Sequence, residues 1–181
     1  DGKGGAWLCS DEFLIHLNLK NRSLKKYKIS KDLLTGNLRN ICRSGDRIYI
    51  GTRNSGLLVF DPSTASTEPY IDLDCPVIAD LNSDGKDLLY VATDGNGAYI
   101  IDTRKRQIVN TYRTNTADFP LPSNAVYTFW HDKTLGISWF GFATDGICYN
   151  YHRHPLFKIY RYKDLNTDGP VSYTHLRAHE T

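Results

Sequence analysis

The run Asp80-Leu81-Asn82-Ser83-Asp84-Gly85 is the part of the sequence best suited to metal chemistry. A calcium loop of the helix–loop–helix type begins with acidic or amide side chains at alternate positions followed by glycine, and residues 164–169 repeat this pattern. The bidentate carboxylate that such a loop needs at its twelfth position is missing, because Val91 stands there. The run therefore predicts a hairpin turn, and neither a metal nor another cofactor is expected.

Histidines and cysteines do not form a catalytic arrangement. His152 and His154 alternate along the chain, but no further His or Cys lies at metal-ligand spacing. No C-x-x-C pair occurs among the four cysteines, Cys9, Cys42, Cys75 and Cys148. They allow three disulfide pairings or remain as free thiols. Because the histidines fall within predicted strands or in the C-terminal tail, no Ser-His-Asp or Cys-His device is available, and no catalytic residue is predicted.

Polar side chains that suit a sugar gather in the turns between apolar segments. Arg, Asn and Asp can bond to hydroxyl groups, and binding residues concentrate on loops that a rigid scaffold holds. The predicted ligand-binding residues are Arg53, Asn54, Asp94, Asn96, Asn115, Asp118 and Asp145. The alternative is that these residues only make turns. The segment 113–123 is the strongest single candidate for a ligand contact, because it is longer than a simple link needs.

The apolar segments that must position these residues recur about every 42 residues. Each unit contains an aromatic-centred strand, a polar turn, a second apolar strand and a final strand that ends in tyrosine. The central aromatic residues are Trp7, Tyr49, Tyr90 and Trp139. The closing tyrosines are Tyr27, Tyr70, Tyr112 and Tyr160. A further apolar segment precedes three of the units, at 38–42, 77–81 and 126–130.

A unit of four short strands with Gly and Asp turns is typical of a propeller blade. No segment has a sustained helical period, so we predict an all-β partial β-propeller of three four-stranded blades and one incomplete blade. Residues 1–30 form the partial blade (strands two to four), the complete blades are 37–72, 76–113 and 123–163, and 164–170 begin the next link. A β-sandwich is the alternative, but Greek-key packing does not explain a fixed period with one aromatic per unit.

Face-to-face packing of blades assigns a structural role to the central aromatics. We predict Trp7, Tyr49, Tyr90 and Trp139 to be core residues rather than a stacking platform for a ligand.

If the strands alternate in direction, the loop between strands two and three shares an end of the blade with the link to the next blade. An incomplete ring leaves two apolar blade faces without neighbours, so we expect the isolated chain to be unstable or to self-associate.

Composition excludes other classes of function. The 181 residues carry a net charge of only +2, with basic and acidic residues interspersed, so neither nucleic acid nor an anionic membrane surface is an expected partner. No apolar run is long enough to cross a bilayer, and there is no signal-peptide pattern. With no methionine and Asp1 first, the chain is expected to be cut upstream. Residues 171–181 match an in-frame translation of a transposase-end sequencing adapter, so we exclude them from fold and function.

Two stretches of the repeat carry a family resemblance. Ile48-Tyr49-Ile50-Gly51-Thr52 followed by Gly56-Leu57, and 121–127 leading to Trp139-Phe140-Gly141, resemble the two-component regulator propeller repeat. The resemblance extends over residues 1–163. Cys9 and Ala92 depart from it, because each stands where the repeat has the glycine of a Gly-Thr pair, and the Thr134-Leu135-Gly136 segment replaces a tighter Asp-Gly turn.

This resemblance implies a role in signalling. In that family the repeats form the periplasmic sensor of Bacteroidetes hybrid two-component histidine kinases, which detect oligosaccharides and signal to transcription through a phosphorelay. It implies an oligosaccharide ligand and, as partners, the missing blades and signalling domains of a dimeric parent in the inner membrane. No kinase motif is present in these residues, so this segment is not expected to be an enzyme itself. The alternatives are a propeller enzyme, such as a polysaccharide lyase or glycoside hydrolase, and a protein-interaction scaffold.

Overall fold

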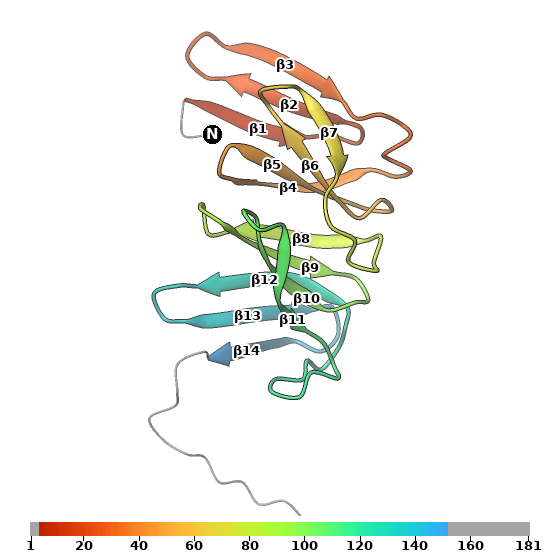
Figure 1. The fold of residues 1–181 in the computed structure, drawn as a ribbon, viewed down its shortest axis with the longest axis vertical. Coiled ribbons are helices and arrows are strands. Elements are labelled where there is room, and N and C mark those ends of the chain that lie inside the picture. Colours follow the sequence, from red (N-terminus) through yellow and green to blue (C-terminus); the bar gives the residue numbers. More distant parts are fainter. Residues whose placement is uncertain (1–3, 152–181) are drawn as a thin grey trace, which may run out of the picture.

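A computed structural model describes residues 4–151, which form four antiparallel sheets (Figure 1). Strands and turns make up this part of the chain, with no helix and so none that could span a membrane. Within each sheet, neighbouring strands follow one another along the chain. The protein is therefore all-β and forms part of a β-propeller, as the repeat predicts.

Each sheet corresponds to one repeat unit. The first contains β1 (Gly5–Cys9), β2 (Phe13–Asn18) and β3 (Ser23–Lys28). The second contains β4 (Leu38–Ser44), β5 (Arg47–Thr52), β6 (Leu57–Asp61) and β7 (Ser66–Pro69). The third contains β8 (Ile78–Ser83), β9 (Leu88–Thr93), β10 (Ala98–Asp102) and β11 (Gln107–Tyr112). The fourth contains β12 (Val126–Asp132), β13 (Ile137–Phe142) and β14 (Ile147–Tyr151). The predicted closing Tyr160 and the pair His152 and His154 lie outside the described residues.

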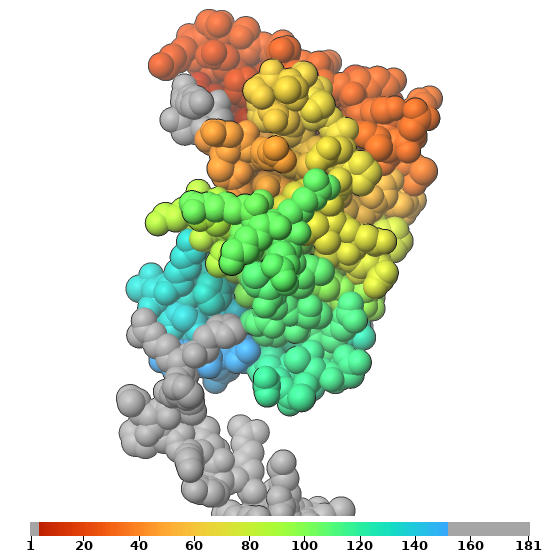
Figure 2. Space-filling view, in the orientation of Figure 1, coloured from red at the N-terminus to blue at the C-terminus, as the bar shows by residue number. Residues whose placement is uncertain are grey.

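The hydrophobic cores lie between neighbouring sheets, in interfaces that we call seams. Figure 2 shows the sheets as successive layers along the long axis of the molecule. Alternation along β5 sends Ile48 and Ile50 into the seam with the first sheet and Tyr49 into the seam with the third. The third and fourth sheets meet over Phe129 and Phe140, whose rings stack with centroids 4.7 Å apart. A blade therefore needs a neighbour on each face to bury its side chains.

The four central aromatics differ in burial according to the neighbours of their blade. Tyr49 is 2% exposed and Tyr90 is 3% exposed, each covered by the next sheet. Trp7 is half-buried, with its ring centroid 4.5 Å from that of His16. Trp139, which we predicted as a core residue, is 40% exposed. It occupies the position of Tyr49 and Tyr90 in its own blade. The ring of Tyr149 in the same sheet lies beside it, 5.2 Å away between centroids, but no other sheet of residues 4–151 covers that face.

The first strands of the four-stranded pattern, β4, β8 and β12, explain why the repeat has a glycine in its Gly-Thr pair. In β4, β8 and β12 the register shifts after the first residue, so that Asn40, Asp80 and Thr128 lie opposite strand-two positions Gly51, Ala92 and Gly141. A Cβ atom on Gly51 would clash with Oδ1 of Asn40, and one on Gly141 would lie 2.6 Å from the methyl group of Thr128. Opposite Ala92, the carboxylate of Asp80 is directed to the next blade, where it accepts a 2.7 Å hydrogen bond from the Thr128 hydroxyl.

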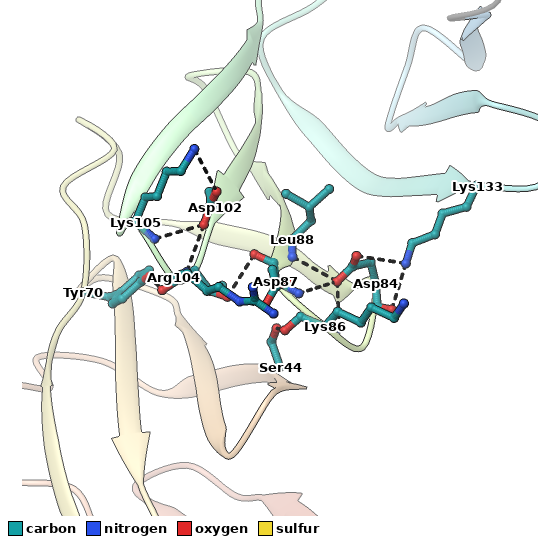
Figure 3. A network of polar contacts seen from close by, with 11 residues as sticks. Ser44, Tyr70, Asp84, Lys86, Asp87, Leu88, Asp102, Arg104, Lys105 and Lys133 are labelled. Carbon is teal, nitrogen blue, oxygen red and sulfur yellow. Dashed lines mark hydrogen bonds and ion pairs between the residues drawn. The ribbon is translucent and has the colours of Figure 1, made fainter.

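A polar network joins the blades at the end where strands one and two meet (Figure 3). The carboxylate of Asp84 accepts hydrogen bonds from the backbone N–H groups of Lys86 and Leu88, and it forms a 2.9 Å ion pair with Lys133 of the next blade. On the other side, the hydroxyl of Ser44 donates to the carbonyl of Lys86 at 2.9 Å. The turn that resembled a calcium loop is thus a hairpin turn that links three blades.

Stability should fall in acid because of Asp84. Burial alone would raise the pKa of this carboxyl, but the hydrogen bonds from Leu88 and Lys86 and the ammonium group of Lys133 outweigh it and lower the pKa to about 2. A lowered pKa contributes stability above the unfolded-state value, and this contribution is lost as the pH falls from about 4 to about 2. Chemical denaturation across this range should show that the variant Asp84→Asn loses about 1 kcal/mol less stability than the original chain.

The variant Asp46→Asn is the matched control for this pH effect. Its side chain is 94% exposed, so its pH dependence should equal that of the unchanged chain. An identical acid response in Asp84→Asn and the unchanged chain would contradict the assignment.

Candidate ligand-binding rim

The loops between strands two and three meet the blade links at one end of the sheets, to the right in Figure 1, and we call this end the rim. The backbone N–H of Gly56 donates to the carbonyl of Pro76 at 2.9 Å, and that of Gly97 donates to the carbonyl of Asn124 at 2.8 Å. The backbone N–H of Arg53 bonds to the carbonyl of Asn37 at 3.0 Å. The two sets of loops therefore share one end, as strand alternation predicts.

A buried threonine at the end of strand two shapes the rim turn in the second and third blades. The hydroxyl of Thr52 donates to the carbonyl of Gly56 at 2.8 Å and accepts from the N–H of Ser55 at 2.8 Å. Thr93 repeats this arrangement with Gly97 at 2.7 Å. Both glycines have a positive φ, which closes the turn without a Cβ clash. The turns are thus held from inside, and their outer side chains remain available.

The predicted ligand-binding residues divide by what their side chains do. Exposed rim positions hold Arg53, Asn54, Asp94, Asn115, Asp118 and Asp145. Asn96 differs, because its side-chain amide donates to the carbonyl of Leu73 at 2.6 Å and fixes the preceding link. Asp145 accepts a 3.0 Å hydrogen bond from the neighbouring Thr144 hydroxyl. Ligand contact by these residues remains a prediction.

The long link 113–123 has a structural use for much of its length. Leu121 is 3% exposed, and Phe119 packs with its ring centroid 6.0 Å from that of Phe140. The link is pinned to itself by a 3.0 Å bond from the N–H of Leu121 to the carbonyl of Arg113. Its extra residues therefore cover the seam between the third and fourth sheets, and exposed Asn115 and Asp118 lie along the same link.

Between the first two blades the rim is hollowed. One hollow of about 390 Å³ is lined by Asp11, Asn37, Leu38, Arg39 and Arg53. The side-chain amide of Asn37 donates to Oδ1 of Asp11 at 3.2 Å and so joins the two blades across it. An adjoining hollow of about 700 Å³ shares these two residues and extends over the link 29–37.

Three polar lining residues of the smaller hollow were not among the predicted ligand-binding residues. Asp11 and Asn37 both fall in rim loops, one on each side of the seam between the first two blades. This placement was the signal from which the sequence could have indicated them as binding residues. Arg39 lies inside the first apolar segment, where the pattern indicated a regular strand. The register shift between Leu38 and Asn40 leaves it exposed at the rim.

A separate hollow of about 520 Å³ lies between the same two blades and includes the turns at the opposite end. Its lining includes Trp7, His16, Arg43 and Arg47. The guanidinium group of Arg43 donates to the carbonyl of Gly45 at 2.9 Å, so it is already engaged.

The cysteines are free thiols in the described structure. Burial is the main cause that raises the pKa of the thiols of Cys9, Cys42 and Cys148, which favours the protonated form. Cys75 is buried, and its thiol lies 3.6 Å from the carbonyl oxygens of Val77 and Asp94. These positions suit packing residues rather than nucleophiles.

Searches of family models and of curated proteins gave no match. Solved structures with a similar fold include the extracellular domains of two putative hybrid two-component systems of B. thetaiotaomicron. For BT3049 the TM-score is 0.60 at 21% identity, over 81% of this chain and 18% of that one. For BT4673 it is 0.59 at 19% identity, over 83% and 19%. This chain therefore spans less than a fifth of either domain, and it shares its fold with the extracellular domains of hybrid two-component systems.

Proposed function

We propose that this chain is part of the sensor region of a hybrid two-component system and binds an oligosaccharide outside the cytoplasm. The fold likeness to the extracellular domains of two such systems carries this proposal. On this view the chain lies on the periplasmic side of the inner membrane. Further blades and a dimeric histidine kinase of the parent protein pass the signal to transcription through a phosphorelay.

The chemistry of the rim supports a sugar as the ligand. In the smaller hollow Arg53 and Asn37 supply hydrogen-bond donors and Asp11 supplies a carboxylate acceptor, and Asp94 is an exposed carboxylate at the rim of the third blade. Vicinal hydroxyl groups need both kinds of partner within a shallow, polar depression.

A glycan microarray tests the proposal. The 181-residue chain should retain at least one class of oligosaccharide, and the double variant Arg53→Ala/Asp94→Ala should bind it roughly ten-fold or more weakly, because each change removes one charge-assisted hydrogen bond. Mass spectrometry of the bound sugar should show unchanged chain length after incubation.

Asp46→Ala is the control, since this exposed side chain lies at the opposite end of the second blade. It should leave binding unchanged. Retention of no saccharide, or equal binding by the unchanged chain and the rim double variant, would contradict the proposal. Shortened oligosaccharides would favour a propeller enzyme instead.

A further inference from the structure

Two arginines with unengaged guanidinium groups face the smaller rim hollow. Within residues 4–151, the guanidinium groups of Arg39 and Arg53 form no hydrogen bond or ion pair. Several other arginines are bound by the fold, and Arg104 pairs with Asp87 at 2.6 Å while Arg113 donates to the Tyr99 hydroxyl at 2.7 Å. Two exposed, unengaged guanidinium groups on one hollow are therefore not explained by the packing of the blades.

Only the first described seam has this basic pair. The register shifts make Arg39, Ala79 and Tyr127 equivalent positions on the three innermost strands. Arg53 directly follows strand two of its blade, and Asp94 directly follows strand two of the next. At the second seam the corresponding residues are thus alanine and aspartate, so the charge is a feature of one site rather than of the repeat.

Acidic groups near the hollow only partly offset this charge. Asp11 is the one carboxylate in the lining, and its Oδ1 already accepts a hydrogen bond from Asn37. Glu12, in the adjoining hollow, is paired with Lys28 at 3.1 Å. Lys31 adds a further cation to the lining of that larger hollow. The charged side chains lining the smaller hollow therefore have a net positive charge.

We propose that the smaller hollow binds an anionic group of the saccharide, either the carboxylate of a uronic acid or a sulfate ester. This inference rests on the proposed function and narrows its ligand to acidic oligosaccharides. A guanidinium group presents a planar fork of N–H donors that matches a carboxylate or sulfate through two parallel hydrogen bonds. The adjoining hollow then receives neutral sugar rings next to the charged one.

Calorimetric titration of the 181-residue chain with matched disaccharides tests the proposal. The probes are a uronic-acid disaccharide, its methyl ester, the neutral parent sugar and a sulfated form of that parent. We expect the charged probes to bind roughly ten-fold or more tightly than the neutral ones, with the difference shrinking as salt increases. The tighter of the two charged probes identifies the source of the anion.

Variants at the two arginines locate the site. Arg39→Gln and Arg53→Gln should each remove most of the preference for charged probes, while Arg39→Lys should keep part of it because the charge remains. Arg47→Gln is the matched control, since Arg47 lines the separate hollow that includes the turns at the opposite end of the same blade pair. Circular dichroism verifies that every variant keeps the sheet content of the original chain.

Three outcomes would overturn the inference. Equal affinity for charged and neutral probes would show that the arginines do not select an anion, while sugar binding itself would stand. Loss of the preference in Arg47→Gln would place the anion at the other hollow. Binding of no saccharide of any kind would remove the proposed function together with the inference.

Discussion

Replacing Phe129 with alanine should lower the free energy of unfolding by about 3–5 kcal/mol. The side chain is fully buried in the seam between the third and fourth sheets. Its ring centroid lies 4.7 Å from that of Phe140 and 5.5 Å from that of Tyr90, so truncation removes contacts to both blades and leaves a cavity. Urea denaturation followed by circular dichroism measures the change.

The control for this prediction is the next residue along β12. Trp130 points to the opposite face of the strand and is 54% exposed, so Trp130→Ala should change stability by less than about 1 kcal/mol. Both residues are large aromatics on one strand, and they differ in the face of the sheet to which their side chains point. Similar losses in the two variants would show that the seam does not dominate stability.

Replacing Gly97 with alanine should cost at least about 3 kcal/mol or prevent folding. The residue has a φ of 83°, and an added Cβ would clash with the backbone carbonyl of Tyr112. A backbone atom in a sheet cannot move aside as a flexible side chain can. The same change would displace the Gly97 N–H from the carbonyl of Asn124 and loosen the rim.

Gly45→Ala separates the steric clash from the backbone conformation. Gly45 also has a positive φ, of 59°, but no atom lies within 4 Å of its added Cβ. This variant should therefore lose only about 1–2 kcal/mol. Thermal unfolding of both variants measures the difference, and equal losses would contradict a clash at Gly97.

The all-β fold could be predicted from the sequence because the same pattern of strands and turns occurs in each of the four repeat units. Each unit has its own turn glycines, and the aromatic on strand two marks the same position in every blade. What one unit could not reveal is whether a neighbour covers it. Trp139 has the same local pattern as Tyr90, yet it is exposed, because burial in this fold is decided by the adjacent blade and not by the strand itself.

The candidate site was predicted less completely, for two physical reasons. Strand alternation correctly placed Arg53 and Asp94 on one rim. Arg39 was missed because a register shift inside an apolar strand has no simple sequence signature, yet it brings that side chain to the hollow. Asn96 is of a residue type that is common in binding sites, but its side-chain amide donates a hydrogen bond to the carbonyl of Leu73. That contact is set by the tertiary structure and could not be predicted from the local sequence.

The location of the cores between blades governs how stability grows with length. An open row of blades has one seam fewer than it has blades, so each added blade contributes one complete core and the end blades are always the weakest. Closing a ring adds a further seam without adding a blade, at only the entropy cost of joining the ends. Unfolding should therefore begin at the ends of an open row, and a substitution in a seam weakens two blades at once.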